Sequence, residues 1–160
     1  MSARKLRLVC PTIIVTVLVF GTAAWVAAGE AATGFPPQVV SALQRLDEIH
    51  VATVRKDGSR SEPAPVWFAF VDGAIWFTTG PDSHKARRVG KGSPMFVSVD
   101  GKKGPYIETR AEIVNDSAMA DRLGKIYADK YWIAWLGFFR PSGARVEAGK
   151  VVLLKLTPAS

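Results

Sequence analysis

The sequence HVATVRKDGSRSEPAPVWFAFVDGAIWFTTG, residues 50–80, decides the fold. Polar and apolar residues alternate over residues 51–55, and the KDGS that follows is a hairpin turn, which predicts a β-strand that reverses direction. VWFAFV and AIWFTT, separated by the turn residues Asp72 and Gly73, predict two further strands. Three strands joined by short turns indicate antiparallel β-structure.

Two prolines, Pro63 and Pro65, stand in the first half of the second of these strands. Proline has no N–H to give to a sheet, so this half is expected to bulge or to lie at an edge. Three more strands are predicted farther on, in PMFVSVD, GPYIETRAEIVND and RVEAGKVVLLKLTP. Short helical or turn segments are expected in QVVSALQRLDEIH, SHKARRVGKG (with Asp82 or Ser83 as N-cap) and SAMADRLGKIYADKYW.

Six short strands with few helices predict a mainly β domain built as a closed or partly closed antiparallel barrel. A doubly wound parallel sheet would need a long helix after nearly every strand. The helices here are too few and too short for that class of fold.

The first 28 residues form a separate segment with the anatomy of a secretory signal. Three basic residues precede an uncharged run from residue 8 to 28, and Val26-Ala27-Ala28 offers a small-residue cleavage site. An uncleaved membrane anchor is the alternative, because the run is long enough to cross a bilayer. Either reading predicts an exported domain, with residues 29–37 as a linker and residues 38–158 as the folded unit.

Charge and cysteine content narrow the function. Removal of residues 1–28 lowers the formal charge from +7 to +4, and the only cysteine, Cys10, leaves with them. Disulfides, thiolate nucleophiles and cysteine-based zinc sites are therefore excluded for the mature domain, and two histidines make a multi-histidine metal site improbable.

A run of basic residues follows the third strand. Thr78 and Thr79 end this strand, and Ser83, Lys85 and then two arginines come next. Hydroxyls and cations gathered in this way suit a bound phosphate, because arginine and lysine both form charge-assisted bonds to it. The alternative is a solvated basic helix face, which is the commoner meaning of such a run.

The order of these segments resembles the flavin-binding split-barrel family that includes pyridoxamine phosphate oxidase and the deazaflavin-dependent reductases. The resemblance is carried by the ATV…DG hairpin, the PVWF strand, the aromatic strand ending in TT, the S-x-K followed by arginines, and a later strand, YIETRAEIVND. It implies a six-stranded antiparallel split barrel with short peripheral helices.

The resemblance also implies which residues hold the cofactor, FMN or a deazaflavin. The cofactor ring would lie beside Pro65, Val66, Trp67 and Phe68, and the ring or its side chain would contact Thr78 and Thr79. The phosphate would be bound by Ser83, His84 and Lys85, together with Arg87 or Arg88. The oxidase branch places an arginine where this chain has Ala64, so pyridoxamine phosphate is not expected as the substrate.

Three functions are weighed. The first is a flavin- or deazaflavin-dependent oxidoreductase that transfers hydride to or from a small organic molecule at a homodimer interface, with YWIAWLGFF (residues 131–139) as the dimer contact. The second is a non-catalytic carrier of a flavin, a haem-derived pigment or a lipid, which the export signal favours because reduced nicotinamides and deazaflavins are cytoplasmic. The third, a nucleic-acid binder, lacks a broad basic face with interleaved aromatic residues.

Overall fold

The computed structural model of the protein describes residues 34–132 and 140–159. The expected signal or anchor, most of the linker and most of the aromatic run at 131–139 lie outside these residues. Among the helices of this described part, none is both long enough and apolar enough to cross a membrane. The helices and strands follow in chain order: α1 Pro37–Leu43, β1 Glu48–Thr53, β2 Ala64–Trp67, β3 Ala69–Val71, β4 Ala74–Thr79, α2 His84–Val89, β5 Met95–Ser98, β6 Ile107–Val114, α3 Ser117–Lys130, α4 Gly143–Glu147 and β7 Val152–Pro158.

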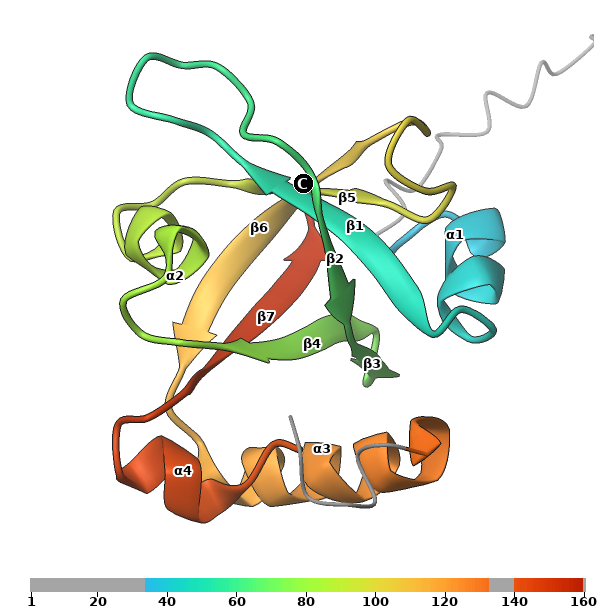
Figure 1. Ribbon diagram of the computed structural model, residues 1–160. Coiled ribbons are helices and arrows are strands. Elements are labelled where there is room, and N and C mark those ends of the chain that lie inside the picture. The colour runs from blue at the N-terminus through green and yellow to red at the C-terminus, as the bar shows by residue number, and fades with distance from the viewer. Residues whose placement is uncertain (1–33, 133–139, 160) are drawn as a thin grey trace, which may run out of the picture. The chain divides into compact units, whose positions relative to one another are not determined.

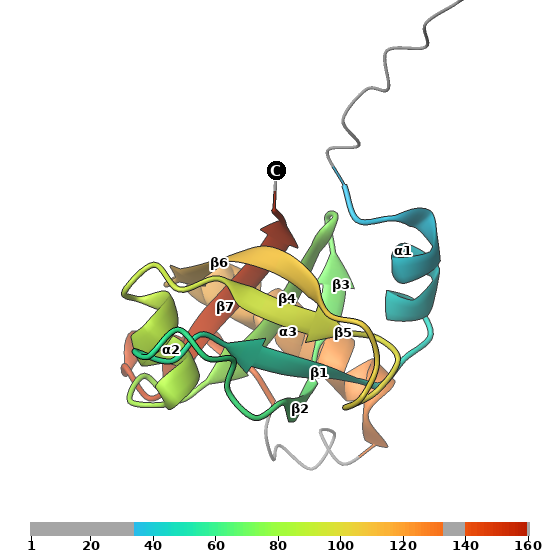
Figure 2. The same ribbon diagram turned by 90° about the horizontal axis from the view of Figure 1, so that it is seen from above.

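The strands form one antiparallel sheet in the order β2-β1-β5-β6-β7-β4-β3. The sheet curls into a nearly closed barrel with α1 and α2 on opposite sides and α3 along the face formed by β3, β4 and β7 (Figure 1). Figure 2, which looks down on the same barrel, keeps α1 and α2 apart on its two sides. The predicted mainly β split barrel with short peripheral helices is confirmed.

Seven strands replace the six expected because the segment at 64–71 is divided. Its first half, β2, pairs with β1, and its second half, β3, pairs with β4. Phe68 lies between them and belongs to neither ladder. The two edges of the sheet are therefore consecutive in the chain and are joined through one residue, which we call the seam. The expectation that the proline-containing half lies at an edge is confirmed.

Two apolar clusters, one inside the barrel and one under α3, explain why β4 is apolar on both faces. Ile75 and Phe77 belong to the barrel interior, whereas Ala74 and Trp76 pack with residues of α3. Side chains alternate between the faces of a strand, so a strand covered on both sides needs a continuous apolar run. Both aromatic residues of β4, Trp76 and Phe77, are accordingly buried.

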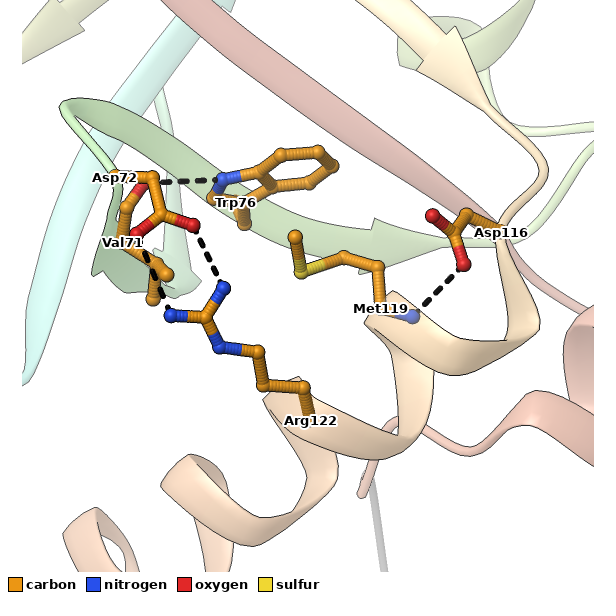
Figure 3. A network of polar contacts seen from close by, with 6 residues as sticks. All are labelled: Val71, Asp72, Trp76, Asp116, Met119 and Arg122. Carbon is orange, nitrogen blue, oxygen red and sulfur yellow. Dashed lines mark hydrogen bonds and ion pairs between the residues drawn. The ribbon is translucent and has the colours of Figure 1, made fainter.

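The hairpin of β3 and β4 is joined to α3 by one ion pair as well as by apolar packing (Figure 3). Arg122 of α3 donates to the carboxylate of Asp72 in the hairpin turn at 2.6 Å, and the Trp76 indole N–H donates to the carbonyl of Val71 at 3.3 Å. Asp116 caps the helix by accepting from the N–H of Met119 at 2.8 Å. The first of these contacts links α3 to the hairpin, and the other two stabilise the hairpin and the helix N-terminus separately.

Two sequence predictions at the start of the domain differ from the structure. The helix expected over residues 38–50 ends at Leu43, and Ile49 and His50 belong to β1. Ile49 is fully buried, as the helical spacing suggested, but in the barrel interior. Phe35, in the stretch expected to be a linker, is also buried and contacts the ring of Phe70 edge-on at 6.1 Å. The packed unit thus includes residues before Pro37.

Candidate functional site

A cavity of about 480 Å³ lies where β2, the end of β4, α2, α3 and the segment after residue 139 meet. This volume is in the usual range for small-molecule and cofactor sites. One wall is apolar and aromatic, and the other carries hydroxyl and charged groups. The lining residues are Glu48, Pro65, Val66, Trp67, Thr78, Thr79, Gly80, Lys85, Tyr127, Arg140, Pro141, Arg145 and Val151.

The aromatic wall is built on Trp67, the last residue of β2. Its indole stacks on the ring of Tyr131 with centroids 4.5 Å apart and planes 9° from parallel. Tyr127 meets Tyr131 edge-on at 5.1 Å and donates its hydroxyl to the carbonyl of Trp67 at 2.8 Å. Burial raises the pKa of Tyr127 well above its ordinary value, so this hydroxyl remains a donor. The orientation of Trp67 is therefore fixed by two residues at the end of α3.

The seam beside this wall takes its hydrogen bonds from α3 instead of from a strand. The N–H of Phe68 donates to the Tyr131 hydroxyl at 3.0 Å. The same hydroxyl can donate its one proton to either of two carbonyl oxygens, that of Asp47 at 2.7 Å or that of Phe68 at 2.9 Å. The ammonium of Lys130 donates to the carbonyl of Phe68 at 3.2 Å. Because buried backbone groups need partners, the end of α3 completes the sheet at the point where the ladder stops.

The opposite wall is polar and follows directly from the end of β4. Thr79 Oγ1 donates to Ser83 Oγ at 3.0 Å, and Ser83 Oγ accepts from the N–H of Ala86 at 3.1 Å, which makes Ser83 the N-cap of α2 as predicted. Lys85 stands on the first turn of this helix and lines the cavity. Partial burial lowers the pKa of its ammonium, because the charged form loses solvation. An anion beside Lys85 would restore the lost stabilisation.

Sequence reasoning missed the residues that close the cavity from the C-terminal side, above all Arg140 and Arg145. This segment folds back on α3 at Gly124, where a side chain would collide with the carbonyl oxygen of Pro141. It is also held by the N–H of Gly143, which donates to Asp121 Oδ1 at 2.8 Å. A glycine inside a helix was the one signal that another backbone approaches closely there. Among the described residues that line the cavity, Lys85 and the two arginines supply three cations against the single carboxylate of Glu48.

The structure divides the residues that the sequence assigned to the cofactor. Six of them line the cavity: Pro65, Val66, Trp67, Thr78, Thr79 and Lys85. Ser83 does not line the cavity but accepts a hydrogen bond from Thr79, which does. Phe68 is fully buried and belongs to the apolar cluster of the barrel interior. The remaining three, His84, Arg87 and Arg88, line a second hollow that shares no lining residue with the cavity. The basic run is thus split between two sites.

Comparisons with known proteins agree with this fold. A conserved hypothetical protein from Mycobacterium tuberculosis is 20% identical with a TM-score of 0.56, covering 81% of this chain and 84% of that protein. The FAD and heme binding protein from Mycobacterium smegmatis is 20% identical with a TM-score of 0.52, covering 76% of this chain and 65% of that one. HutZ, the heme storage protein from Vibrio cholerae, is 12% identical with a TM-score of 0.51, and the match covers 79% of this chain and 92% of that protein.

At these identities the solved structures establish the fold alone, and no curated protein matches the sequence. The family is shown by a different comparison. The family model described as pyridoxamine 5'-phosphate oxidase matches residues 35–160, which include every strand of the barrel and every residue that lines the cavity. The resemblance drawn from the sequence is confirmed, and the chain belongs to the pyridoxamine 5'-phosphate oxidase family.

Proposed function

We propose that the protein is an oxidoreductase that uses FMN, or a deazaflavin, to exchange hydride with a small organic molecule. The observation that supports this most is the convergence on one cavity of six residues that the family resemblance assigned to the cofactor. Pro65, Val66 and Trp67 come from one strand, Thr78 and Thr79 from another and Lys85 from a helix, yet all six line the same space. Family membership supports the same assignment.

The two walls fit the two halves of such a cofactor. A planar heteroaromatic ring suits the apolar wall, because Trp67 is a flat surface held still by its stack on Tyr131. A phosphate suits the polar wall, where Lys85 supplies charge and Thr78 and Thr79 supply hydroxyls. When bound, the flavin or deazaflavin supplies the hydride chemistry, and the protein supplies binding, orientation and electrostatics.

The side chains that line the cavity act by holding and excluding rather than by acid–base steps. Lys85 neutralises negative charge, Trp67 covers one side of the ring position, and Tyr127 keeps the Trp67 carbonyl in place. Arg140 and Arg145 face the same space from the C-terminal segment and favour an anionic group there. Ala64 stands where the oxidase branch has arginine, so a substrate other than pyridoxamine phosphate is proposed.

A non-catalytic carrier on the same barrel is the second candidate, with a flavin as its cargo. The lining of the cavity favours a flavin over a haem-derived pigment, because no histidine is among the described residues that line it. Carriage and catalysis would use the same cavity, so binding alone does not separate them. Measuring turnover with a panel of quinones and enones distinguishes an enzyme, which reduces some of them, from a carrier, which reduces none.

Two further parts of the proposal concern location and assembly. The domain is proposed to act outside the cytoplasm, as residues 1–28 predict, and N-terminal sequencing of the protein recovered from cell fractions tests this. It is also proposed to form a homodimer through the aromatic run, of which Trp132, at its described start, is 80% exposed. Light scattering of the wild type and of Trp132→Ala tests the dimer.

The central test is a titration of the purified protein with FMN and with a deazaflavin, followed by absorption and fluorescence. We expect saturable binding of one of them, and we expect Lys85→Ala to weaken it about tenfold or more through loss of a charge-assisted bond. Lys103→Ala, at an exposed lysine far along the chain from the cavity lining, is the matched control. A protein that binds neither compound, or a Lys85→Ala variant that binds like Lys103→Ala, would refute the proposal.

A further inference from the structure

The second hollow, of about 710 Å³, is lined by many basic side chains. We call it the cationic hollow and define it by six basic residues: Arg55, Lys56, His84, Arg87, Arg88 and Lys91. No aspartate or glutamate is among the described residues that line it. Five of the six side chains carry a permanent positive charge at neutral pH. A concave site of this kind attracts multiply charged anions, because its charges reinforce one another.

The basic residues are brought together by contacts between segments far apart in the sequence. Arg55 and Lys56 belong to the loop after β1, and the others belong to α2 and the turn that follows it. Two hydrogen bonds join these parts. Arg88 Nη1 donates to Thr53 Oγ1 at 2.8 Å, and the N–H of Val54 donates to Ser93 Oγ at 3.2 Å. The hollow is therefore a product of the fold and not only of a basic stretch of sequence.

Two of the guanidinium groups are also held in place. Arg55 donates from Nη1 to the carbonyl of Arg60 at 2.7 Å and to Ser59 Oγ at 3.0 Å. The guanidinium group of Arg88 is ordered by its hydrogen bond to Thr53 Oγ1. Groups that are already ordered lose less conformational entropy when a ligand binds, which increases affinity.

None of the six basic residues forms an ion pair in the described part of the chain, although Arg55 lies close enough to Asp57 and Glu62 to help lower the pKa of both carboxyls. The ion pairs found there join Lys102 to Glu62 and Arg122 to Asp72, and neither pair touches the hollow. Like charges brought together repel, so this arrangement is least favourable when nothing is bound. A bound anion with two or more charges removes the repulsion.

We propose that the cationic hollow is a second binding site, separate from the cofactor cavity, for a phosphoryl group of the diphosphate type. Guanidinium groups match phosphate oxygens with paired hydrogen bonds, and five cations balance a doubly or triply charged group better than a single carboxylate. Lys85 faces the cavity while Arg87 and Arg88 face the hollow, so α2 separates the two sites. The phosphoryl group belongs either to a soluble phosphorylated metabolite or to an anionic lipid headgroup.

The first experiment titrates the full chain, labelled with ¹⁵N, with inorganic pyrophosphate and follows amide and arginine Nε–Hε resonances. Saturable shifts are expected in residues 54–56 and 84–94, with acetate at equal ionic strength giving none. Arg87→Gln and Lys91→Gln, both at exposed positions, are each expected to weaken binding about tenfold. Lys85→Gln and the control Lys103→Gln are expected to leave it unchanged.

Four results would overturn the proposal. Resonance shifts that do not saturate with pyrophosphate would show that the hollow is an ordinary basic surface. The same shifts produced by acetate would show this as well. Equal losses in Arg87→Gln and Lys103→Gln would lead to the same conclusion. Displacement of pyrophosphate by saturating FMN would make the hollow part of the cofactor site. Pyrophosphate binding in a protein that takes up no flavin would support the second site while refuting the proposed function.

A second measurement identifies the source of the phosphoryl group. Vesicles of phosphatidylcholine with and without phosphatidylglycerol are floated with the wild type and with the Arg87→Gln/Lys91→Gln variant. Flotation that depends on phosphatidylglycerol and is lost in the variant assigns the hollow to a lipid headgroup. Equal flotation of the two proteins, together with saturable pyrophosphate binding, assigns it to a soluble phosphorylated molecule.

Discussion

Replacing Tyr131 with phenylalanine removes one hydroxyl from the seam and leaves the stacked ring in place. The N–H of Phe68, a fully buried residue outside both ladders, then loses its partner at 3.0 Å. A buried donor without a partner costs about 1–3 kcal/mol. Tyr127→Phe removes only the bond to the Trp67 carbonyl, and about 1 kcal/mol is expected. Both variants should unfold at lower urea concentration, by about 1 M for Tyr131→Phe if the slope of the transition is unchanged.

Tyr106→Phe is the matched control for these two variants. Its hydroxyl also donates to a backbone carbonyl, that of Lys102 at 2.7 Å, but on the surface, where water replaces the lost bond. Less than about 0.5 kcal/mol is expected for it. If Tyr127→Phe and Tyr131→Phe destabilise the protein no more than Tyr106→Phe does, then α3 does not complete the sheet, and the reasoning about the seam is wrong.

Three other changes test the cavity and its supports. Gly124→Ala should destabilise the protein by about 1–3 kcal/mol in urea unfolding, because the added methyl group collides with Pro141, whereas Gly34→Ala, in open space, should not. Ser83→Ala should lower the unfolding free energy by about 1 kcal/mol through loss of the helix cap; an unchanged midpoint would contradict the role given to Ser83. Because burial lowers the pKa of Lys85, affinity for an anionic cofactor should fall as the pH rises through that lowered pKa, at pH values below those of an ordinary lysine. Lys85→Ala should lack this dependence in titrations across the alkaline range, and a dependence equal to that of the wild type would assign it to another group.

Local patterns were enough to predict most of the barrel because turn residues separate most of its strands, β2 and β3 excepted. Gly73 has φ +72° and Asp72 has φ 52°, so the Asp-Gly pair forms the tight turn that its composition predicts. The end of α1 could not be predicted in the same way. Ile49 satisfies the helical spacing and also faces the barrel interior in β1, so its apolar character was consistent with both. Only pairing with β2 and β5 selects the strand.

About half of the residues that line the cavity could be predicted, because the order of their segments resembles the flavin-binding split-barrel family. Trp67, Thr79 and Lys85 lie in segments whose order along the chain is distinctive. Arg140 and Arg145 reach the cavity only because their segment folds back over Gly124, and no local pattern encodes a contact of that kind. The division of the basic run between two sites depends on which side of α2 each residue faces, and this follows from how the helix packs against β1 and β6.

The consecutive edges of the barrel also limit how copies of this chain can associate. An exposed sheet edge can recruit a strand from another molecule, and long flat edges are prone to aggregation. Here one edge is the four residues of β2, with Pro65 in it, and the other is the three residues of β3. Neither offers a template long enough to extend the sheet into a neighbouring molecule. Two copies are therefore not expected to associate by pairing through either of these two strands.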